Sequence, residues 1–177
     1  MTSSGSQIHG ALIEVLEVGV LLLGPSGIGK SECALELVRR GHCLVADDVV
    51  RIDRTDDDRL RGSAPELIRH YMEIRGIGLL HIPDLYGPDS VKQQAFIDLV
   101  CHLERWREGA EYERVGLERP AENLAGVEVP VLVLALRPAG SMATLIEVAA
   151  RDFLLRREGV SAPKQLDERV RGEIRRP

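Results

Sequence analysis

Residues 24–31 fit the G-x-x-x-x-G-K-[ST] pattern of a phosphate-binding loop at every fixed position. Glycines allow the sharp turns that bring successive backbone N–H groups close to an anion. The lysine can place its ammonium on the outer phosphates of a nucleotide, and the serine hydroxyl can bind Mg²⁺. The sequence therefore predicts a polyphosphate site formed by Gly24, Pro25, Ser26, Gly27, Ile28, Gly29, Lys30 and Ser31.

Two adjacent acids, Asp47 and Asp48, follow the apolar run 42–46. An acidic residue at the end of a strand beside a phosphate loop can hold Mg²⁺ or activate a nucleophile. If the strand continues through residues 49–50, the two carboxylates point to opposite faces, one to the phosphates and one to a second partner. A turn with two solvated acids is the alternative, but the apolar residues on both sides count against it.

Three further polar residues are candidates for the site. Glu73 and Arg75 are separated by one residue, so they share a face if the chain is extended there. A carboxylate beside a guanidinium suits metal and phosphate binding, although a structural ion pair explains the same spacing equally well. His9 is expected at one end of a strand, where a histidine is usually only a polar end residue.

The flanking elements have the order that a phosphate loop requires. The apolar run 18–23 before the loop predicts a buried strand, and residues 32–40 after it predict a helix that ends at Gly41. Residues 8–18 predict a first strand, joined by a hairpin at Glu17 to the strand before the loop. Strand, loop and helix together support a nucleotide-binding α/β fold.

The rest of the chain predicts further elements of such a fold. Alternation over residues 93–103 predicts one strand, and residues 128–136 predict another, in which Pro130 favours a sheet edge or a strand start. The first part of the stretch 65–80 could form one helical turn, and residues 83–88 are typical of a turn-rich loop. Residues 142–157 predict an amphipathic helix whose buried stripe is Leu145, Val148, Ala149 and Phe153.

Length and composition limit the classes of protein. A chain of 177 residues, 44% hydrophobic and 29% charged, is typical of one soluble globular domain. The formal net charge of −5 gives no reason to expect a nucleic-acid partner, and no apolar run is long enough to cross a membrane. Three cysteines without a C-x-x-C pair indicate reduced thiols in a cytoplasmic protein. We expect a disordered leader over 1–7, a catalytic domain over 8–163, and a charged tail or short helix over 164–177.

With these residues in place, the chain resembles the catalytic domain of HPr kinase/phosphorylase over residues 8–163. Four stretches besides the phosphate loop carry the resemblance: His9-Gly10, the segment 42–48 with its double Asp, Met-Glu-Ile-Arg-Gly-Ile-Gly over 72–78, and Leu-Ile-Glu-Val-Ala-Ala over 145–150. The resemblance implies a P-loop core related to phosphoenolpyruvate carboxykinase, with a mixed β-sheet flanked by helices. It also implies a hexamer that acts in the cytoplasm.

The resemblance further implies an activity. This family phosphorylates a serine of HPr, a small carrier protein of the sugar phosphotransferase system, and so regulates carbon metabolism. The donor is ATP or pyrophosphate, with Mg²⁺, and the same site removes the phosphate with inorganic phosphate. By position, the resemblance implies Mg²⁺ ligation by Ser31 and Glu73. The positions that match its catalytic residues are His9, Lys30, Asp47, Asp48 and Arg114.

Some features depart from the resemblance or leave alternatives open. The family usually has an N-terminal domain that this sequence lacks, so the sequence is either the catalytic domain alone or a short member. The loop 139–141 lacks the usual arginine, which leaves the dephosphorylation direction open. The sequence also leaves open whether Asp47 or Asp48 is the base. Taken without the resemblance, Arg114 is a surface arginine. A small-molecule kinase or a nucleotide or phosphate sensor without turnover would use the same loop. A GTP-dependent switch is disfavoured because the only asparagine, Asn123, is not in an N-K-x-D motif.

Overall fold

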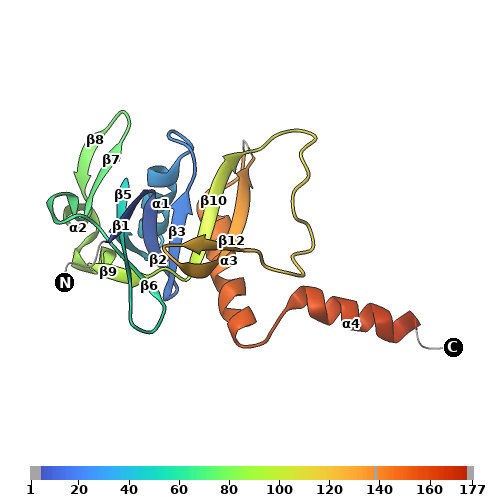
Figure 1. Cartoon of the computed structure of the whole chain (residues 1–177). Coiled ribbons are helices and arrows are strands. Elements are labelled where there is room, and N and C mark those ends of the chain that lie inside the picture. The colour runs from blue at the N-terminus through green and yellow to red at the C-terminus, as the bar shows by residue number, and fades with distance from the viewer. Residues whose placement is uncertain (1–4, 138, 175–177) are drawn as a thin grey trace.

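The computed structural model describes residues 5–137 and 139–174, and its centre is a six-stranded mixed sheet (Figure 1). The strand order is β11-β12-β10-β3-β2-β4, in which β3, β10 and β12 run parallel and the other pairs are antiparallel. The predicted α/β class with a mixed sheet flanked by helices is confirmed. The strands are β2 (Ala11–Val15), β3 (Val18–Leu23), β4 (Cys43–Ala46), β10 (Leu99–Arg105), β11 (Ala121–Leu124) and β12 (Val127–Leu136).

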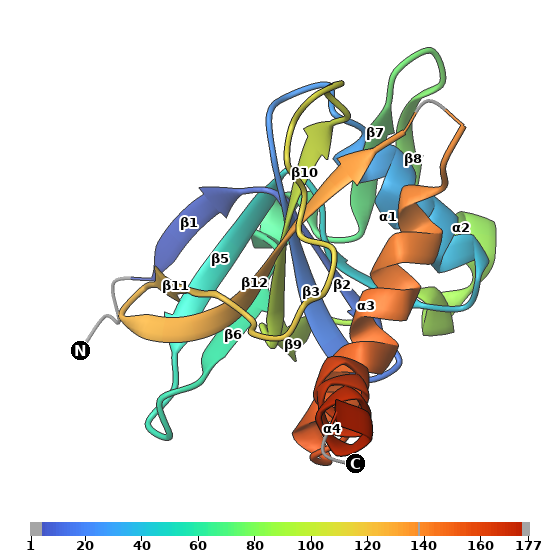
Figure 2. The ribbon, with the colours of Figure 1, turned by 90° about the vertical axis from the view of Figure 1, so that its right-hand side faces the viewer.

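A second, antiparallel sheet covers one face of the central sheet, and helices cover the other (Figure 2). Alternate residues of the central strands point to the two faces, so each face has its own apolar core. On one side Leu21 belongs to a core with Ile52 of the second sheet, and on the other Leu22 belongs to a core with Leu37 and Ile146 of the helices. The second sheet contains β1 (Ser6–His9), β5 (Val49–Arg54), β6 (Leu60–Ser63) and β9 (Gln94–Phe96), and the helices are α1 (Lys30–Arg39) and α3 (Met142–Arg157).

Strand β3 and helix α1 confirm the predicted flanks of the phosphate loop. Every residue of β3 is buried, as expected for a strand covered on both faces. The predicted hairpin before it is also present, because β2 pairs with β3 through a two-residue turn at Leu16 and Glu17, both with positive φ. The loop at residues 24–29 is thus anchored between the central strand and the helix.

The chain crosses between the two sheets at three places, and this corrects three predictions of single strands. Residues 8–18 form β1 and β2, residues 42–50 form β4 and β5, and residues 93–103 form β9 and β10, each pair divided between the two sheets. The alternation of apolar residues continues across each crossing because both strands face the shared core. Periodicity therefore predicted the strands and could not detect the change of sheet.

The ends of the chain differ from the predicted division. Residues 1–4 of the predicted leader lie outside the described residues, but Ser6 and Gln7 belong to β1 and pair with β5, so these two residues are not disordered as predicted. Helix α4 (Ala162–Ile174) begins before the boundary expected at residue 163 and extends away from the sheets (Figure 1). Within the described ranges, we find no helix long and apolar enough to span a membrane.

Two details of other elements were predicted wrongly. Helix α3 has the predicted bounds, but Leu145 and Val148 are 41% and 58% exposed, and the residues it buries are Met142, Ala143, Ile146, Ala149 and Ala150. Ala149 is buried as predicted and Phe153 is partly buried against the same core, so the buried face is only partly shifted from the predicted one. The predicted loop at 83–88 contains a short helix, α2 (Ile82–Tyr86), followed by a 3₁₀ turn (Pro88–Ser90).

Strand β12 is an inner strand, although Pro130 favoured an edge or a strand start. Pro130 lies at the end of the ladder with β11, opposite Ala121, and the ladder with β10 begins only at Val131. A proline lacks the N–H that a ladder needs. Its position between the two ladders therefore leaves both of them intact.

Candidate active site

The phosphate loop turns sharply at three glycines. Gly24, Gly27 and Gly29 have φ of +146°, +78° and +103°, values that residues other than glycine rarely adopt. At Gly24 space is also limiting, because a Cβ atom there would lie 2.6 Å from the carbonyl oxygen of Leu103. Helix α1 begins directly after Gly29. Its first N–H groups and the positive end of its dipole therefore face the loop, the arrangement that favours a bound phosphate.

Lys30 lies at the floor of this loop and is 8% exposed. Its Nζ donates hydrogen bonds to the carbonyl oxygens of Gly24, at 2.7 Å, and Pro25, at 3.1 Å. A phosphate oxygen carries negative charge and is a stronger acceptor than a carbonyl. The ammonium is thus held within the loop, where it can exchange a carbonyl for a phosphate oxygen.

Ser31 joins the loop to the first of the two acids. Its Oγ donates to the carboxylate of Asp47, with 3.0 Å to each oxygen. Asp47 is 7% exposed, and burial raises its pKa to about 6, against the lowering effect of the Ser31 hydrogen bond and with a further rise from the charge of Asp48. The Asp47 carboxylate therefore holds the Ser31 hydroxyl from below and has little contact with solvent.

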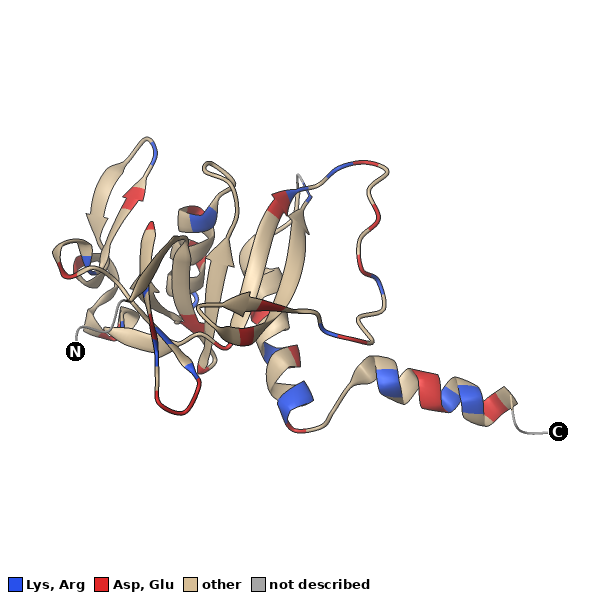
Figure 3. Cartoon of the chain, viewed as in Figure 1, with Lys and Arg blue, Asp and Glu red and all other residues tan. Residues whose placement is uncertain are grey.

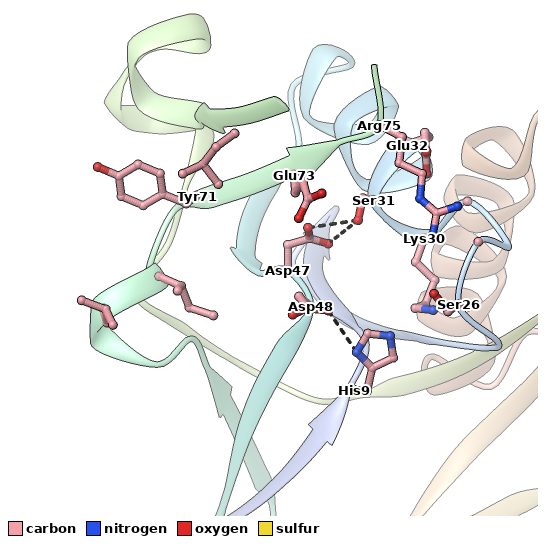
Figure 4. Close-up of a pocket in the computed structure, with 15 residues that line it drawn as sticks. His9, Ser26, Lys30, Ser31, Glu32, Asp47, Asp48, Tyr71, Glu73 and Arg75 are labelled. Carbon is pink, nitrogen blue, oxygen red and sulfur yellow. Dashed lines mark hydrogen bonds and ion pairs between the residues drawn. The ribbon is translucent and has the colours of Figure 1, made fainter. Parts of the chain in front are cut away.

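Asp48 has a different partner and environment. Its carboxylate lies 3.1 Å from Nδ1 of His9, and the two side chains are 68% and 54% exposed. The strand does not continue through the pair as predicted, because Asp48 has φ of +68° and the chain turns there from β4 into β5. The two carboxylates nevertheless face different partners, the phosphate loop and His9, as Figure 4 shows.

A hairpin forms the opposite wall of the site. It consists of β7 (Tyr71–Ile74) and β8 (Gly78–His81), and a 3₁₀ turn at Glu66–Ile68 precedes it, where one helical turn was predicted. Glu73 and Arg75 form no ion pair with each other in the described part of the chain, so the alternative of a structural ion pair between them does not hold. The Arg75 guanidinium lies near the phosphate loop, 3.6 Å from where a Cβ on Gly27 would be.

These groups line one cavity of about 540 Å³, a volume in the range of small-molecule sites. The structure brings together predicted site residues from four separate segments of the chain, although Gly24, Pro25 and Ile28 of the loop do not themselves line the cavity. Figure 4 shows the labelled side chains around one space beside the loop. The polar residues that line the cavity are His9, Ser26, Lys30, Ser31, Glu32, Asp47, Asp48, Glu73 and Arg75.

Arg114 is the predicted catalytic residue that the structure does not bring to this cavity. It is exposed in the long connection 106–120 between β10 and β11, which loops away from the sheet (Figure 1). The Ala139-Gly140-Ser141 loop is also separate from the cavity, because the Ser141 hydroxyl caps α3 and contacts Glu36 of α1. No part of the cavity wall thus comes from either loop.

Sequence reasoning missed an apolar wall. Leu67, Ile68, Tyr71 and Leu79 line the cavity, and Leu67 and Leu79 are 91% and 70% exposed. Large apolar side chains so exposed beside a polar site often mark a surface for another molecule. The signal in the sequence was weak, because an apolar residue in a short strand or turn is usually assigned to the core.

The donor set of the cavity fits Mg²⁺. The hydroxyl of Ser31 and the carboxylates of Asp47 and Glu73 all line it, and these are hard oxygen donors. Over residues 5–137 and 139–174 no group of three or more His, Cys, Asp or Glu side chains is arranged to hold a metal alone. Mg²⁺ is commonly held by one or two carboxylates together with phosphate oxygens and water, so the two observations agree.

Burial of Asp47 predicts an effect on stability. Its pKa is raised in the folded protein, so folding favours the protonated form, and the free energy of unfolding falls as pH rises from about 4 to about 6, by roughly 3 kcal/mol in all. Asp47→Asn removes this charge, and we expect a higher thermal midpoint than the unmodified chain at pH 7 and a similar one at pH 4, both without Mg²⁺.

Thermal unfolding followed by circular dichroism at the two pH values measures this effect. Asp48→Asn is the matched control, because it removes one charge from the same turn at an exposed position. Equal midpoints for Asp47→Asn and the unmodified chain at pH 7 would contradict the expectation.

The comparisons with known proteins agree with the geometry. The family model described as HPr Serine kinase C-terminal domain matches residues 2–170. The HPr kinase/phosphorylase of Caldanaerobacter subterraneus subsp. tengcongensis is 50% identical over 167 residues, which are 94% of this chain and 55% of that protein. The Bacillus subtilis HPr kinase/phosphorylase is 46% identical over 163 residues, which are 92% of this chain and 53% of that protein.

A solved structure is similar as well. The HPr(Ser) kinase/phosphatase from Coxiella burnetii superposes with a TM-score of 0.80 at 33% identity, over 87% of this chain and 93% of that one. The chain spans about half the length of the curated relatives it matches.

Proposed function

Since the chain belongs to the HPr serine kinase C-terminal domain family, we propose that it transfers a phosphoryl group from ATP to a serine of an HPr-type carrier protein. The observation that carries the proposal is that the phosphate loop, the Ser31–Asp47 pair and the His9–Asp48 pair line one cavity. Phosphoryl transfer requires positioning and charge neutralisation more than covalent chemistry. The cavity can therefore hold a polyphosphate and an acid-activated serine hydroxyl in the in-line arrangement that transfer requires.

The loop supplies most of the positive charge. Its amides, the start of α1 and the Lys30 ammonium would hold the polyphosphate and take up the negative charge that develops during transfer. Arg75 lies beside the loop and would add a guanidinium to the same phosphates. Ser31 and Glu73 would hold Mg²⁺, with Asp47 orienting the Ser31 hydroxyl, and the ion supplies further charge neutralisation when bound.

We assign the general base to Asp48 and not to Asp47. A serine carried by another protein has to reach the base from outside, and Asp48 is exposed whereas Asp47 is buried beneath Ser31. His9, 3.1 Å away, would orient the Asp48 carboxylate. The carboxylate would accept the serine proton during phosphorylation and, once protonated, return it in the reverse reaction with inorganic phosphate.

The apolar wall supports a protein substrate over a small metabolite. A kinase for small molecules closes a lid over its substrate, whereas here the exposed side chains of Leu67 and Leu79 stand at the edge of the cavity. Apolar residues at the rim of a site suit the surface of a partner protein. A sensor without turnover remains the second alternative, and it would not need an exposed base beside the loop.

This wall gives a testable expectation. Leu67→Ser with Leu79→Ser removes apolar area that only a protein substrate would cover, so KM for the carrier should rise about tenfold or more while KM for ATP stays within twofold. Leu145→Ser with Leu155→Ser is the matched control, because these leucines are 41% and 47% exposed on α3 and are not part of the cavity. An unchanged KM for the carrier in the first variant would argue for another substrate.

The activity itself is tested with labelled ATP, Mg²⁺ and two sets of acceptors, a purified HPr-type carrier and a panel of small hydroxyl metabolites. Label on the carrier alone supports the proposal. Label on a metabolite supports the small-molecule kinase, and nucleotide binding without any transfer supports the sensor.

The finer features of the family are also part of the proposal. We propose pyrophosphate as a second donor, since it presents the same groups to the loop. We also propose kinship of the core with phosphoenolpyruvate carboxykinase, a hexameric assembly, and a cytoplasmic location, which the three free thiols support. Arg114 would act on the transferring phosphate only after movement of the connection 106–120, toward its own cavity or that of a neighbouring subunit.

A further inference from the structure

A second cavity lies where the connection 106–120, the end of α3 and the start of α4 meet, apart from the phosphate loop. Its volume is about 770 Å³. Figure 3 shows basic residues in the last turns of α3, and basic and acidic residues mixed along α4. Among the residues that line the cavity, four are basic and one is acidic, which is a local excess of positive charge in a chain with a formal net charge of −5. The cationic residues that line the cavity are Arg119, Arg156, Arg157 and Lys164.

The contacts of these side chains leave charge uncompensated. Asp152 accepts hydrogen bonds both from Arg119 and from Nε of Arg156, the latter at 2.7 Å, so one carboxylate serves two guanidinium groups. Burial and the neighbouring charge of Arg156 lower the pKa of Arg119, although Asp152 opposes them.

The two outer cations have no such partner. Arg157 and Lys164 are exposed and form neither ion pairs nor side-chain hydrogen bonds with other described residues. Glu118 is the one acidic residue of the described chain that lines the cavity. With Asp152, it leaves two of the four positive charges unmatched.

A buried hydroxyl provides an independent sign of a missing partner. Ser161 lines the cavity, is 8% exposed, and its Oγ has no hydrogen-bond partner among the described residues. The residue directly precedes α4, whose first backbone bond runs from the N–H of Gln165 to the carbonyl of Ser161 at 3.0 Å, yet its hydroxyl does not cap the helix. Buried hydroxyls are almost always hydrogen-bonded, so this one lacks the partner that such groups usually have.

We propose that this cavity binds a small phosphate-bearing anion. Arg119, Arg157 and Lys164 would pair with its oxygens, Ser161 would donate its hydroxyl hydrogen, and the N-terminus of the 13-residue helix α4 adds a favourable dipole. The volume exceeds what one phosphate group needs, and Leu117 and Phe153 offer apolar contact for an organic part. The proposal does not depend on the reaction at the phosphate loop.

A bound anion would add to the contacts that join the connection 106–120 to α3, which include the Arg119–Asp152 ion pair and the hydrogen bond from Arg156 to the carbonyl of Gly116. Leu117 and Arg119 belong to the connection 106–120, whereas Arg157 and Lys164 belong to α3 and α4. A ligand held by both groups ties the end of the connection to the helices. Amide hydrogen exchange at residues 116–119 should therefore slow when the ligand is added.

Isothermal titration calorimetry of the Lys30→Ala variant measures the affinity of the second cavity for each probe, because this substitution weakens competing binding at the phosphate loop. The probes are inorganic phosphate, pyrophosphate and glycerol 3-phosphate. We expect saturable binding, and at least tenfold weaker binding when Arg157→Gln and Lys164→Gln are added. The matched control instead adds Arg169→Gln and Arg171→Gln on α4, which remove the same amount of positive charge outside the cavity. This control should change the affinity by less than twofold.

Ser161→Ala separates a ligand role from a structural one. Because the hydroxyl has no partner in the described chain, its removal should leave the thermal midpoint unchanged or higher, while affinity for the best probe falls about threefold to tenfold. Tighter binding of glycerol 3-phosphate than of inorganic phosphate would identify an ester as the ligand, and the reverse order would identify the free ion. The proposal is overturned if no probe binds at millimolar concentration, or if the control pair weakens binding as much as the cavity pair.

Discussion

Replacement of Lys30 by alanine is expected to lower the rate of phosphoryl transfer by about a hundredfold to a thousandfold, the size of effect seen when one preorganised donor to a transition state is removed. Lys30 is 8% exposed and two carbonyls of the loop hold its ammonium in place, so its loss leaves the loop without this preorganised charge. Single-turnover transfer from labelled ATP to the carrier measures the effect. Nucleotide binding should weaken as well, because Lys30 contacts the same phosphates before and during transfer.

Lys92→Ala is the matched control for this variant. Lys92 also forms a contact through its ammonium, an ion pair with Glu14, but it lies outside the cavity. We expect its transfer rate to stay within a factor of two of the unmodified chain. If Lys30→Ala retained more than a tenth of the activity while remaining folded, the assignment of the loop as the donor site would be wrong.

Replacement of Asp48 by asparagine is expected to lower the transfer rate by about a hundredfold to ten-thousandfold, the usual contribution of a general base. Asparagine keeps the shape of the side chain and a hydrogen bond to His9, but it cannot accept the serine proton. Because Asp48 does not contact the phosphate loop, affinity for Mg²⁺ and ATP should change little. Rapid-quench kinetics of transfer, together with an equilibrium titration of nucleotide, separate the two quantities.

Asp47→Asn provides the contrast. Its carboxylate contacts Ser31, so this variant should raise the Mg²⁺ concentration needed for half-maximal activity and lose less of the rate at saturating Mg²⁺. The opposite pattern, with loss of the chemical step in Asp47→Asn and of Mg²⁺ affinity in Asp48→Asn, would exchange the roles of the two acids.

The site was predictable because its chemistry is concentrated in short segments. The phosphate loop depends on local backbone geometry, so its spacing and its flanking strand and helix were visible in the sequence and are present in the structure. Asp47 and Asp48 were visible for a similar reason, since they end an apolar run. The sequence predicted that the two acids face different partners, but not which acid faces which, because that depends on the turn at Asp48 and on the pairing of β1 with β5, which places His9 beside Asp48.

The parts that escaped prediction depend on contacts between distant segments. Alternation in β1 and β2 continues across Gly10 because both strands face apolar cores, so it could not reveal that the chain changes sheets there. The exposed face of α3 was misjudged because Ile146 and three alanines are buried in place of the larger Leu145 and Val148. Arg114 matched a family position by its neighbours in sequence, yet its connection lies away from the cavity.

The central claim is that one cavity aligns a polyphosphate with a serine activated by Asp48. Intact-mass measurement of a purified HPr-type carrier after incubation with this chain, Mg²⁺ and ATP tests it most directly, with fragmentation to locate the modified residue. The account predicts a carrier that gains one phosphoryl group on a serine, and no gain with Asp48→Asn. A carrier of unchanged mass in the presence of folded, nucleotide-binding protein would contradict it.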